Sequence, residues 1–262
     1  MKNISELNAP KIKGVFTDID DTVTLDGKLY AEGFNALWEL KKQGFIVIPI
    51  TGRPAGWCDH IARFWPVDGV VGENGAFYFR VDNQNFIRRF VLDDKTRNEN
   101  RLKLEKASNE ALVKWPFLKL ASDQLYRECD LAIDYCEDVK EPLSEQTIKD
   151  MMDFFINKGA EAKLSSIHIN TWFGKYDKLG ACKLILKECF DIDLDKEKEN
   201  FIYSGDSPND EPMFEYFPNS VGVANVSKFV KHFTHLPKYI TNHEGSYGFA
   251  EMVEKICSLK KQ

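Results

Sequence analysis

Two aspartates, Asp18 and Asp20, directly follow a short apolar segment and could do acid–base or metal chemistry. The segment from Gly14 to Phe16 is typical of a buried strand, and an open α/β sheet binds its ligands at the carboxyl ends of its strands. Carboxylates crowded at such an end raise each other's pKa unless a cation neutralises them, and Mg²⁺ prefers a few carboxylates together with phosphate oxygens. The pattern therefore predicts a magnesium site. The alternative is a strand that runs into an acidic, solvated turn.

Polar groups follow two further apolar segments. They are Thr51, Gly52 and Arg53 after residues 45–50, and Asp206, Asn209 and Asp210 after residues 201–204. Asp, Asn and Gly also form turns, so any one of these strand ends could be explained by turn chemistry alone. Three such ends favour a shared site, because parallel strands bring their carboxyl ends to one edge of the sheet.

The segments that must position these residues alternate between strands and helices. A strand at 14–16, a helix at 31–41 and a strand at 45–50 form a βαβ unit, whose continuous apolar strands indicate a parallel sheet buried on both faces. The same pattern returns in the helix 179–189 and the strands 201–204 and 220–223, before a closing helix at 248–259. We therefore expect an α/β fold with a discontinuous parallel-sheet core.

The middle of the chain has a different pattern of predicted helices and strands. After the polar break at 82–85 come a strand at 86–92, a helix at 95–114, a strand at 129–135, a helix at 144–157 and a strand at 165–173. Mixed helices and strands of this kind predict an inserted α+β domain. We place the core at residues 1–82 and 176–262 and the insert at 83–175.

The strand at 165–173 alternates, so His168, Asn170 and Trp172 share one face. This face is either an ordinary solvated sheet face or a wall of the site, and the sequence leaves both interpretations open.

The composition limits the classes of partner that the protein could bind. The net charge is −6, which argues against nucleic acid or an anionic membrane as the main partner. The six cysteines form no Cys-x-x-Cys pair and no apolar segment is long enough to span a membrane, so we expect reduced thiols in a cytoplasmic protein. The histidines His232, His235 and His243 lack the further ligands of a zinc site, so we expect them to be surface residues.

The motifs together resemble those of the haloacid dehalogenase (HAD) superfamily. The resemblance is carried by Asp18-Ile19-Asp20-Asp21-Thr22, Thr51-Gly52-Arg53, a downstream lysine and Gly205-Asp206-Ser207-Pro208-Asn209-Asp210. The segments Glu73-Asn74-Gly75-Ala76 and Tyr239-Ile240-Thr241-Asn242 further resemble the Cof-type branch of sugar phosphatases. The resemblance covers essentially the whole chain and implies a Rossmann-like core with an inserted α+β cap domain.

The resemblance also implies roles for the motif residues. Asp18 would be the nucleophile, and Asp20 would act as general acid and then general base. Asp18, Asp206 and the backbone carbonyl of Asp20 would hold Mg²⁺, with Asp210 and Asn209 supporting the metal directly or through water.

The sequence identifies the motif lysine and the substrate-binding residues less definitely than the aspartates. Lys178 begins a helix and is our choice for the lysine that keeps the nucleophile ionised, with Lys175 as the competing candidate. Thr51 would donate its hydroxyl to the phosphoryl group. The candidates for binding the rest of the substrate are Gly52, Arg53, Asn209, His168, Asn170 and Trp172. Arg53 could instead pair with an acidic neighbour.

We therefore expect a Mg²⁺-dependent phosphatase that acts on a small phosphorylated metabolite, with a sugar phosphate implied by the family resemblance. The protein would be a monomer or a small homo-oligomer. A phosphosugar mutase of the same superfamily is the main alternative, since it shares this arrangement of residues. A non-catalytic metabolite-binding module is a further alternative, but it would not require both Asp18 and Asp20.

Overall fold

A six-stranded parallel sheet forms the centre of the molecule. The computed structural model describes residues 1–165 and 167–260. The strands lie in the order β1 (Lys2–Asn3), β13 (Tyr239–Ile240), β12 (Ser220–Gly222), β11 (Phe201–Gly205), β2 (Gly14–Thr17) and β3 (Ile46–Pro49). All neighbouring strands are paired in parallel. The α/β fold with a parallel-sheet core, predicted from the apolar strands, is confirmed.

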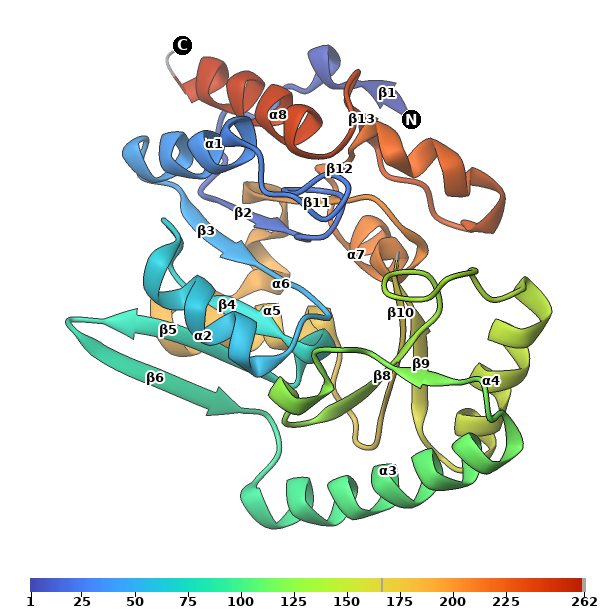
Figure 1. Ribbon diagram of the computed structural model, residues 1–262. Coiled ribbons are helices and arrows are strands. Elements are labelled where there is room, and N and C mark those ends of the chain that lie inside the picture. The colour runs from blue at the N-terminus through green and yellow to red at the C-terminus, as the bar shows by residue number, and fades with distance from the viewer. Residues whose placement is uncertain (166, 261–262) are drawn as a thin grey trace.

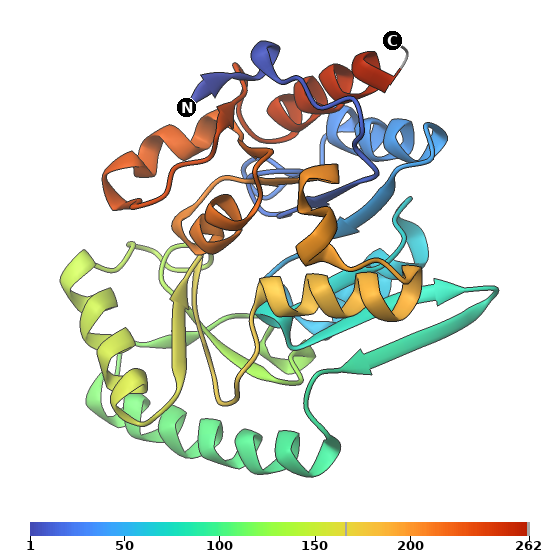
Figure 2. The same cartoon turned by 180° about the vertical axis from the view of Figure 1, so that it is seen from behind.

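Helices cover both faces of this sheet (Figure 1). Helices α1 (Ala31–Lys42) and α8 (Gly245–Lys260) lie side by side on one face, and α5 (Lys178–Phe190) and α7 (Glu211–Tyr216) pack on the other, as the reverse view shows (Figure 2). Successive residues of a strand point to opposite faces, so Val15 packs with the first pair of helices and Phe16 with the second. Each buried strand therefore needs apolar residues at every position.

A short antiparallel sheet extends this core. It contains β4 (Val70–Gly72), β5 (Phe77–Asp82) and β6 (Asn85–Phe90), and α2 (Ala55–Phe64) packs against it. A parallel bridge between Ile50 and Val71 joins it to the end of β3. The predicted boundary between core and insert at 82/83 falls in the turn between β5 and β6, and this division of the chain stays a prediction.

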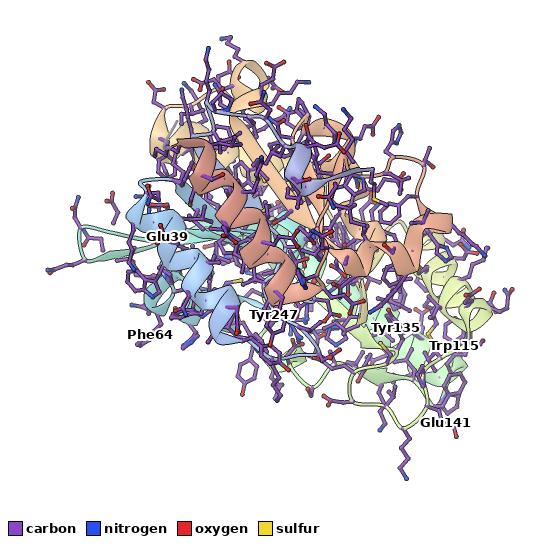
Figure 3. All side chains as sticks on the ribbon, turned by 90° about the horizontal axis from the view of Figure 1, so that it is seen from above. Glu39, Phe64, Trp115, Tyr135, Glu141 and Tyr247 are labelled. Carbon is purple, nitrogen blue, oxygen red and sulfur yellow. The ribbon has the colours of Figure 1, made fainter. Side chains whose placement is uncertain are left out.

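The middle of the chain forms a separate four-stranded antiparallel sheet, with the order β7 (Lys119–Leu120), β8 (Asp130–Asp134), β10 (His168–Trp172) and β9 (Glu161–Leu164). Helices α3 (Asp94–Lys114) and α4 (Glu145–Asn157) pack against one face with their own apolar core (Figure 1). We call the unit formed by this sheet, α3 and α4 the cap. In the view from above, its residues Trp115, Tyr135 and Glu141 lie at the opposite end from Glu39 and Phe64 of the core (Figure 3).

The strand expected at 165–173 is shorter in the structure, and it is preceded by β9, which the sequence pattern missed. Residue 166 lies outside the described residues. The closing helix begins at Gly245 rather than Gly248. Short helical segments complete the structure: α6 (Leu194–Glu197), η1 (Ile4–Glu6), η2 (Glu73–Gly75), η3 (Gln124–Tyr126), η4 (Lys198–Asn200), η5 (Pro208–Asp210) and η6 (Ala224–His232). Within residues 1–165 and 167–260, each helix is too short or too polar to cross a membrane.

Candidate active site

Asp18 stands at the end of β2, where the pairing of β2 with β11 fixes its backbone. The Asp18 amide donates a hydrogen bond to the carbonyl of Ser204 at 2.8 Å, which continues the parallel ladder by one residue. The side chain of Asp18 is buried beneath the cap. The strand pairing therefore brings Asp18 beside the end of β11, where the next carboxylates begin.

Asp206 and Asp210 follow β11 in a tight turn. The Asp210 carboxylate accepts hydrogen bonds from the backbone amides of Asp206 at 3.1 Å and Ser207 at 3.3 Å, which holds the turn closed. Gly205 makes this possible, because a Cβ atom there would lie 2.4 Å from Asp210 Oδ2. Oxygens of Asp18, Asp206 and Asp210 all lie within 4.8 Å of one another.

Lys178 is the cation that faces these carboxylates. Its ammonium donates to Asp18 Oδ1 at 2.8 Å and to Asp210 Oδ1 at 2.7 Å. Lys175 is exposed on the loop before α5. The structure thus brings Lys178, the lysine preferred from the sequence, to the carboxylates. We call Asp18, Asp206, Asp210 and Lys178 the catalytic cluster.

The Glu73-Asn74-Gly75 turn supports the start of α5. Gly75 has φ of +106°, and a Cβ atom on it would lie 2.1 Å from the carbonyl oxygen of Asp177, the residue before Lys178. Only glycine allows this approach without moving α5. The turn thereby fixes the backbone from which the Lys178 side chain extends.

Burial dominates the electrostatics of the catalytic cluster. It raises the pKa of Asp18 to about 8 against the opposing effect of Lys178, and it raises the pKa of Asp206, with further increases from Asp210 and Asp18. Burial alone would lower the pKa of Lys178, but the two ion pairs outweigh it and raise the pKa. Three carboxylates face a single ammonium, so the cluster is anionic when ionised. Carboxylate oxygens at this spacing suit a hard divalent cation.

Asp20 lies on the side of the cluster that faces the cap, where Arg53 holds it. Arg53 Nε donates to the two Asp20 oxygens at 2.9 and 3.1 Å. The other edge of the guanidinium donates to Glu137 of the cap, at 2.8 Å from Nη2 to Oε1. The sequence left open whether Arg53 binds substrate or pairs with an acidic neighbour, and in this structure it pairs with both carboxylates.

Thr51 and Gly52 connect the end of β3 to the same region. Thr51 is fully buried, and its hydroxyl accepts a hydrogen bond from the Arg53 amide at 3.0 Å. The Gly52 carbonyl accepts from Arg127 of the cap at 2.8 Å. This loop therefore carries both a candidate phosphoryl-binding hydroxyl and a contact between core and cap.

The cap residues predicted to share one face of a strand are all buried, so the solvated-face interpretation is wrong. His168 and Asn170 line a nearly closed cavity of about 10 Å³ together with Asp18, Asp20, Gly52, Arg53, Ser165, Ile167, Ser207 and Asn209. We call it the catalytic cavity. Trp172 lines a separate cavity of about 620 Å³, where its ring stacks on Tyr176 and Lys175 also lies. Asn209 borders both cavities.

A second buried group of charges joins the cap to the core. Arg127 donates to Asp123 at 3.0 and 3.2 Å and to Asp130 at 2.9 and 3.1 Å. Glu73 of the core accepts hydrogen bonds from the backbone amides of Ala55 and of residues 128–130. We call Glu73, Asp123, Arg127 and Asp130 the junction cluster. Asn170 donates to Asp130 at 3.0 Å and so links this cluster to the catalytic cavity.

The sequence patterns missed three residues near the site. Glu137 lies between Arg53 and His168, with its Oε2 2.9 Å from His168 Nε2. Thr22 donates to Asp206 at 3.3 Å, and the hydroxyl of Tyr203 donates to Asp210. Thr22 was part of the first motif and carried a signal, whereas a lone glutamate in a cap loop carried none. The three predicted surface histidines are exposed, and none belongs to the potential metal-binding group of the described residues, which is Asp18, Asp206 and Asp210.

Comparison with known proteins supports a common origin for this arrangement. A family model described as haloacid dehalogenase-like hydrolase matches residues 139–253. The chain is 27% identical over 246 residues to a phosphoglycolate phosphatase of Nitrosopumilus maritimus, which covers 92% of this chain and 95% of the relative. It is 25% identical over 250 residues to a phosphoglycolate phosphatase of Thermoplasma volcanium, with 94% and 97% covered.

Solved structures share the fold. A crystal structure of a Thermoplasma acidophilum protein superposes with a TM-score of 0.72 at 18% identity and covers 95% of this chain and 99% of the other. A HAD/COF-like hydrolase from Plasmodium vivax superposes with a TM-score of 0.70 at 19% identity, with 98% and 99% covered. Fold, motif order and relatives agree: the chain is similar to haloacid dehalogenase-like hydrolases and is an enzyme of the phosphatase type.

Proposed function

We propose that this chain is a Mg²⁺-dependent phosphomonoesterase that acts on a small phosphorylated metabolite through an aspartyl-phosphate on Asp18. The catalytic cluster carries the proposal, because one lysine faces three buried carboxylates whose oxygens lie within 4.8 Å of one another. Asp18, Asp206 and Asp210, with the backbone carbonyl of Asp20, would hold Mg²⁺. When bound, the ion neutralises charge on the phosphoryl oxygens.

In the first half-reaction, a carboxylate oxygen of Asp18 attacks phosphorus, and the bond from phosphorus to the alcohol oxygen breaks. Lys178, 2.8 Å from Asp18, favours the ionised nucleophile. Asp20 gives its proton to the departing alcohol oxygen, so the alcohol leaves neutral. The buried hydroxyl of Thr51 is available to donate a hydrogen bond to the phosphoryl group.

In the second half-reaction, the carboxylate of Asp20 takes a proton from water as the water oxygen attacks phosphorus. The bond between phosphorus and Asp18 breaks, which restores both aspartates and releases inorganic phosphate. His168 and Asn170 of the cap narrow the catalytic cavity to about 10 Å³. A space of this size holds about one water molecule, so the cap must move for any phosphate ester to enter.

The family resemblance implies a sugar phosphate as substrate, and the relatives suggest a second candidate. Two of them are named phosphoglycolate phosphatases, enzymes named for a phosphate ester of a short carboxylic acid. A cationic side chain, Arg53, lines the catalytic cavity and suits such an acid. The cytoplasmic location and the division into core and cap at 82/83 and 175/176 remain parts of this proposal.

The proposal is tested by measuring inorganic phosphate released from sugar phosphates, glycerates, phosphoglycolate and nucleotides, with and without Mg²⁺. We expect Mg²⁺-dependent release that Asp18→Asn abolishes, because the amide cannot form the phosphoenzyme. Asp59→Asn is the matched control, since Asp59 is an exposed carboxylate on α2 that pairs with Arg63.

Release that persists in Asp18→Asn, or that is unaffected by removal of Mg²⁺, would overturn the mechanism. Phosphoryl transfer between positions of a sugar bisphosphate, with little phosphate released, would favour the mutase instead. A panel in which folded, Mg²⁺-loaded protein releases no phosphate would count against the phosphatase, and mutase activity would then be tested with a bisphosphate activator.

A further inference from the structure

Glu137 occupies a position that a carboxylate of the substrate could take. It lies on the loop after β8, and its carboxylate is held by Arg53 of the core and His168 of the cap, at 2.8 and 2.9 Å. These two side chains line the catalytic cavity together with Asp18 and Asp20. A position beside Asp20, lined by Arg53 and His168, is thus filled by a side chain of the protein itself.

The geometry of Arg53 sets the size of the group that could replace Glu137. One edge of its planar guanidinium holds Asp20, which would protonate the leaving oxygen, and the other edge holds Glu137. The two edges share Nη2, which lies 2.9 Å from Asp20 Oδ1 and 2.8 Å from Glu137 Oε1, so a single nitrogen bridges the two acids. A leaving group that reaches from Asp20 to the Glu137 position needs an oxygen and a carboxylate joined by a short carbon chain.

The remaining charges near Arg53 do not fill the same role. Asp123 lies 3.6 Å from Arg53 Nη1, but it is also held by two hydrogen bonds from Arg127. The Glu137 side chain is 28% exposed, unlike the fully buried acids of the junction cluster, so it can turn toward water without breaking the core. The contacts with His168 and Arg53 hold the pKa of Glu137 at about 2, so it is ionised at neutral pH.

We propose that Arg53 and His168 form a carboxylate-binding subsite, that Glu137 fills it in the resting enzyme, and that the substrate is a phosphate ester of a short hydroxy acid, whose carboxylate displaces Glu137. This rests on the proposed phosphatase function and narrows its substrate class. Displacement exchanges one carboxylate for another, so Arg53 and His168 keep a carboxylate beside them throughout. Glu137 thereby acts as a specificity residue, because a neutral leaving group gains nothing by displacing it.

Two matched substrates test the subsite: 2-phosphoglycolate, and 2-hydroxyethyl phosphate, in which a neutral hydroxymethyl group replaces the carboxylate. We expect the wild-type enzyme to prefer the acid in kcat/KM by at least about tenfold, the factor of one charge-assisted hydrogen bond. Glu137→Gln should increase this preference at least about threefold through a lower KM for the acid, because the competing charge is gone. Arg53→Lys should reduce the preference, because lysine lacks the planar fork.

Glu141→Gln is the control, because Glu141 is an exposed glutamate of the same cap loop at the margin of the molecule (Figure 3). A preference unchanged in Glu137→Gln, or a wild-type enzyme that hydrolyses both esters equally well, would overturn the inference while leaving the phosphatase proposal intact.

A binding measurement separates the inference from turnover. Asp18→Asn and the double variant Asp18→Asn/Glu137→Gln are titrated with 2-phosphoglycolate in the presence of Mg²⁺ by calorimetry. Tighter binding by the double variant supports the subsite whatever the turnover. Equal or weaker binding overturns it. Failure of phosphate release from every ester, with this gain in affinity present, would reject the phosphatase mechanism alone.

Discussion

Two buried clusters of charge meet at the interface of core and cap, and they differ in how well their charges are satisfied. The catalytic cluster and the junction cluster each contain three carboxylates and one cationic side chain. In the junction cluster, Glu73 accepts hydrogen bonds from four backbone amides, and Asp130 accepts from Arg127 and Asn170. In the catalytic cluster, Asp206 accepts a long hydrogen bond of 3.3 Å from Thr22.

A structural charge cluster can be distinguished from a catalytic one by how fully hydrogen bonds and ion pairs satisfy its ionised groups. Ionised groups are tolerated inside a protein when hydrogen bonds and partners replace the lost water. The junction cluster meets this requirement with its own donors and holds the cap against the core. The catalytic cluster meets it only in part, so its carboxylates can still bind a cation and, with it, a phosphoryl group. The following predictions test this contrast by removing one group at a time.

Arg127→Met should cause the largest loss of stability. It leaves Asp130 buried without a cation and Asp123 with only the 3.6 Å contact to Arg53, which costs about 3–5 kcal/mol in the free energy of unfolding. Urea unfolding measures the loss. Lys149→Ala is the control, because its pair with Asp153 is exposed to solvent and contributes little to stability. Equal effects of the two substitutions would show that the junction cluster does not hold the cap.

The pH dependence of the free energy of unfolding should reveal the raised pKa of Glu73. Burial, and then Asp130, raises its pKa from 4.5 to about 7. Because the folded-state pKa is the higher one, the stability that Glu73 contributes is present below pH 4.5 and is lost as the pH rises through 7, by at most about 1.4 kcal/mol per pH unit.

Urea unfolding is measured at saturating Mg²⁺, which offsets the charges of the catalytic cluster. The wild type is compared with Glu73→Gln, because burial also raises the pKa of the neighbouring Asp130. Glu73→Gln should be less stable than the wild type, because its amide N–H groups face backbone donors. It should also lack the pH dependence, so the difference between the two proteins narrows as the pH rises from 4.5 to 7. A difference that widens would contradict the prediction.

Asp206→Asn should separate activity from stability. Mutation of a group that supports a metal ligand typically lowers metal affinity or activity about 10–100-fold. Loss of a carboxylate that binds the metal directly should therefore lower activity about a hundredfold or more. The metal-free variant should nevertheless unfold at a higher temperature than the metal-free wild type, because one of three crowded carboxylates is gone. Thermal unfolding in a chelator and phosphate-release assays with Mg²⁺ measure both effects. A variant that is less stable without metal would place Asp206 with the structural charges.

The sequence predicted the catalytic cluster better than the junction cluster, for a physical reason. Asp18, Asp206 and Asp210 each follow an apolar strand directly, so a local pattern places them at one edge of the sheet. Lys178 begins a helix within reach of that edge. Glu73, Arg127 and Glu137 meet only when the cap docks on the core, and no local spacing records such a contact.

The fold shows the same contrast between local and distant information. Strands β2, β3 and β11 are buried on both faces, so their continuous apolar sequences identify them. Strand β9 (Glu161–Leu164) is an edge strand whose two polar residues face water, and four alternating residues resemble a loop. Its position becomes clear only from its pairing with β10.

Thr22→Val should have the smallest effect of these substitutions. It tests most directly how the two clusters differ in the hydrogen bonding of their carboxylates. Thr22 is fully buried, and its hydroxyl is a hydrogen-bond donor to Asp206, whereas valine keeps its shape without the donor. Removal of such a supporting contact should weaken Mg²⁺ binding about tenfold, measured by activation of phosphate release or by calorimetry. Thr24→Val is the matched control, because the Thr24 hydroxyl donates to the Ile19 carbonyl in the same turn and does not touch Asp206. If both variants bind Mg²⁺ equally, Thr22 only packs in the turn. If only Thr22→Val weakens binding, the sparse hydrogen bonding of Asp206 is part of how the catalytic cluster is tuned for its metal.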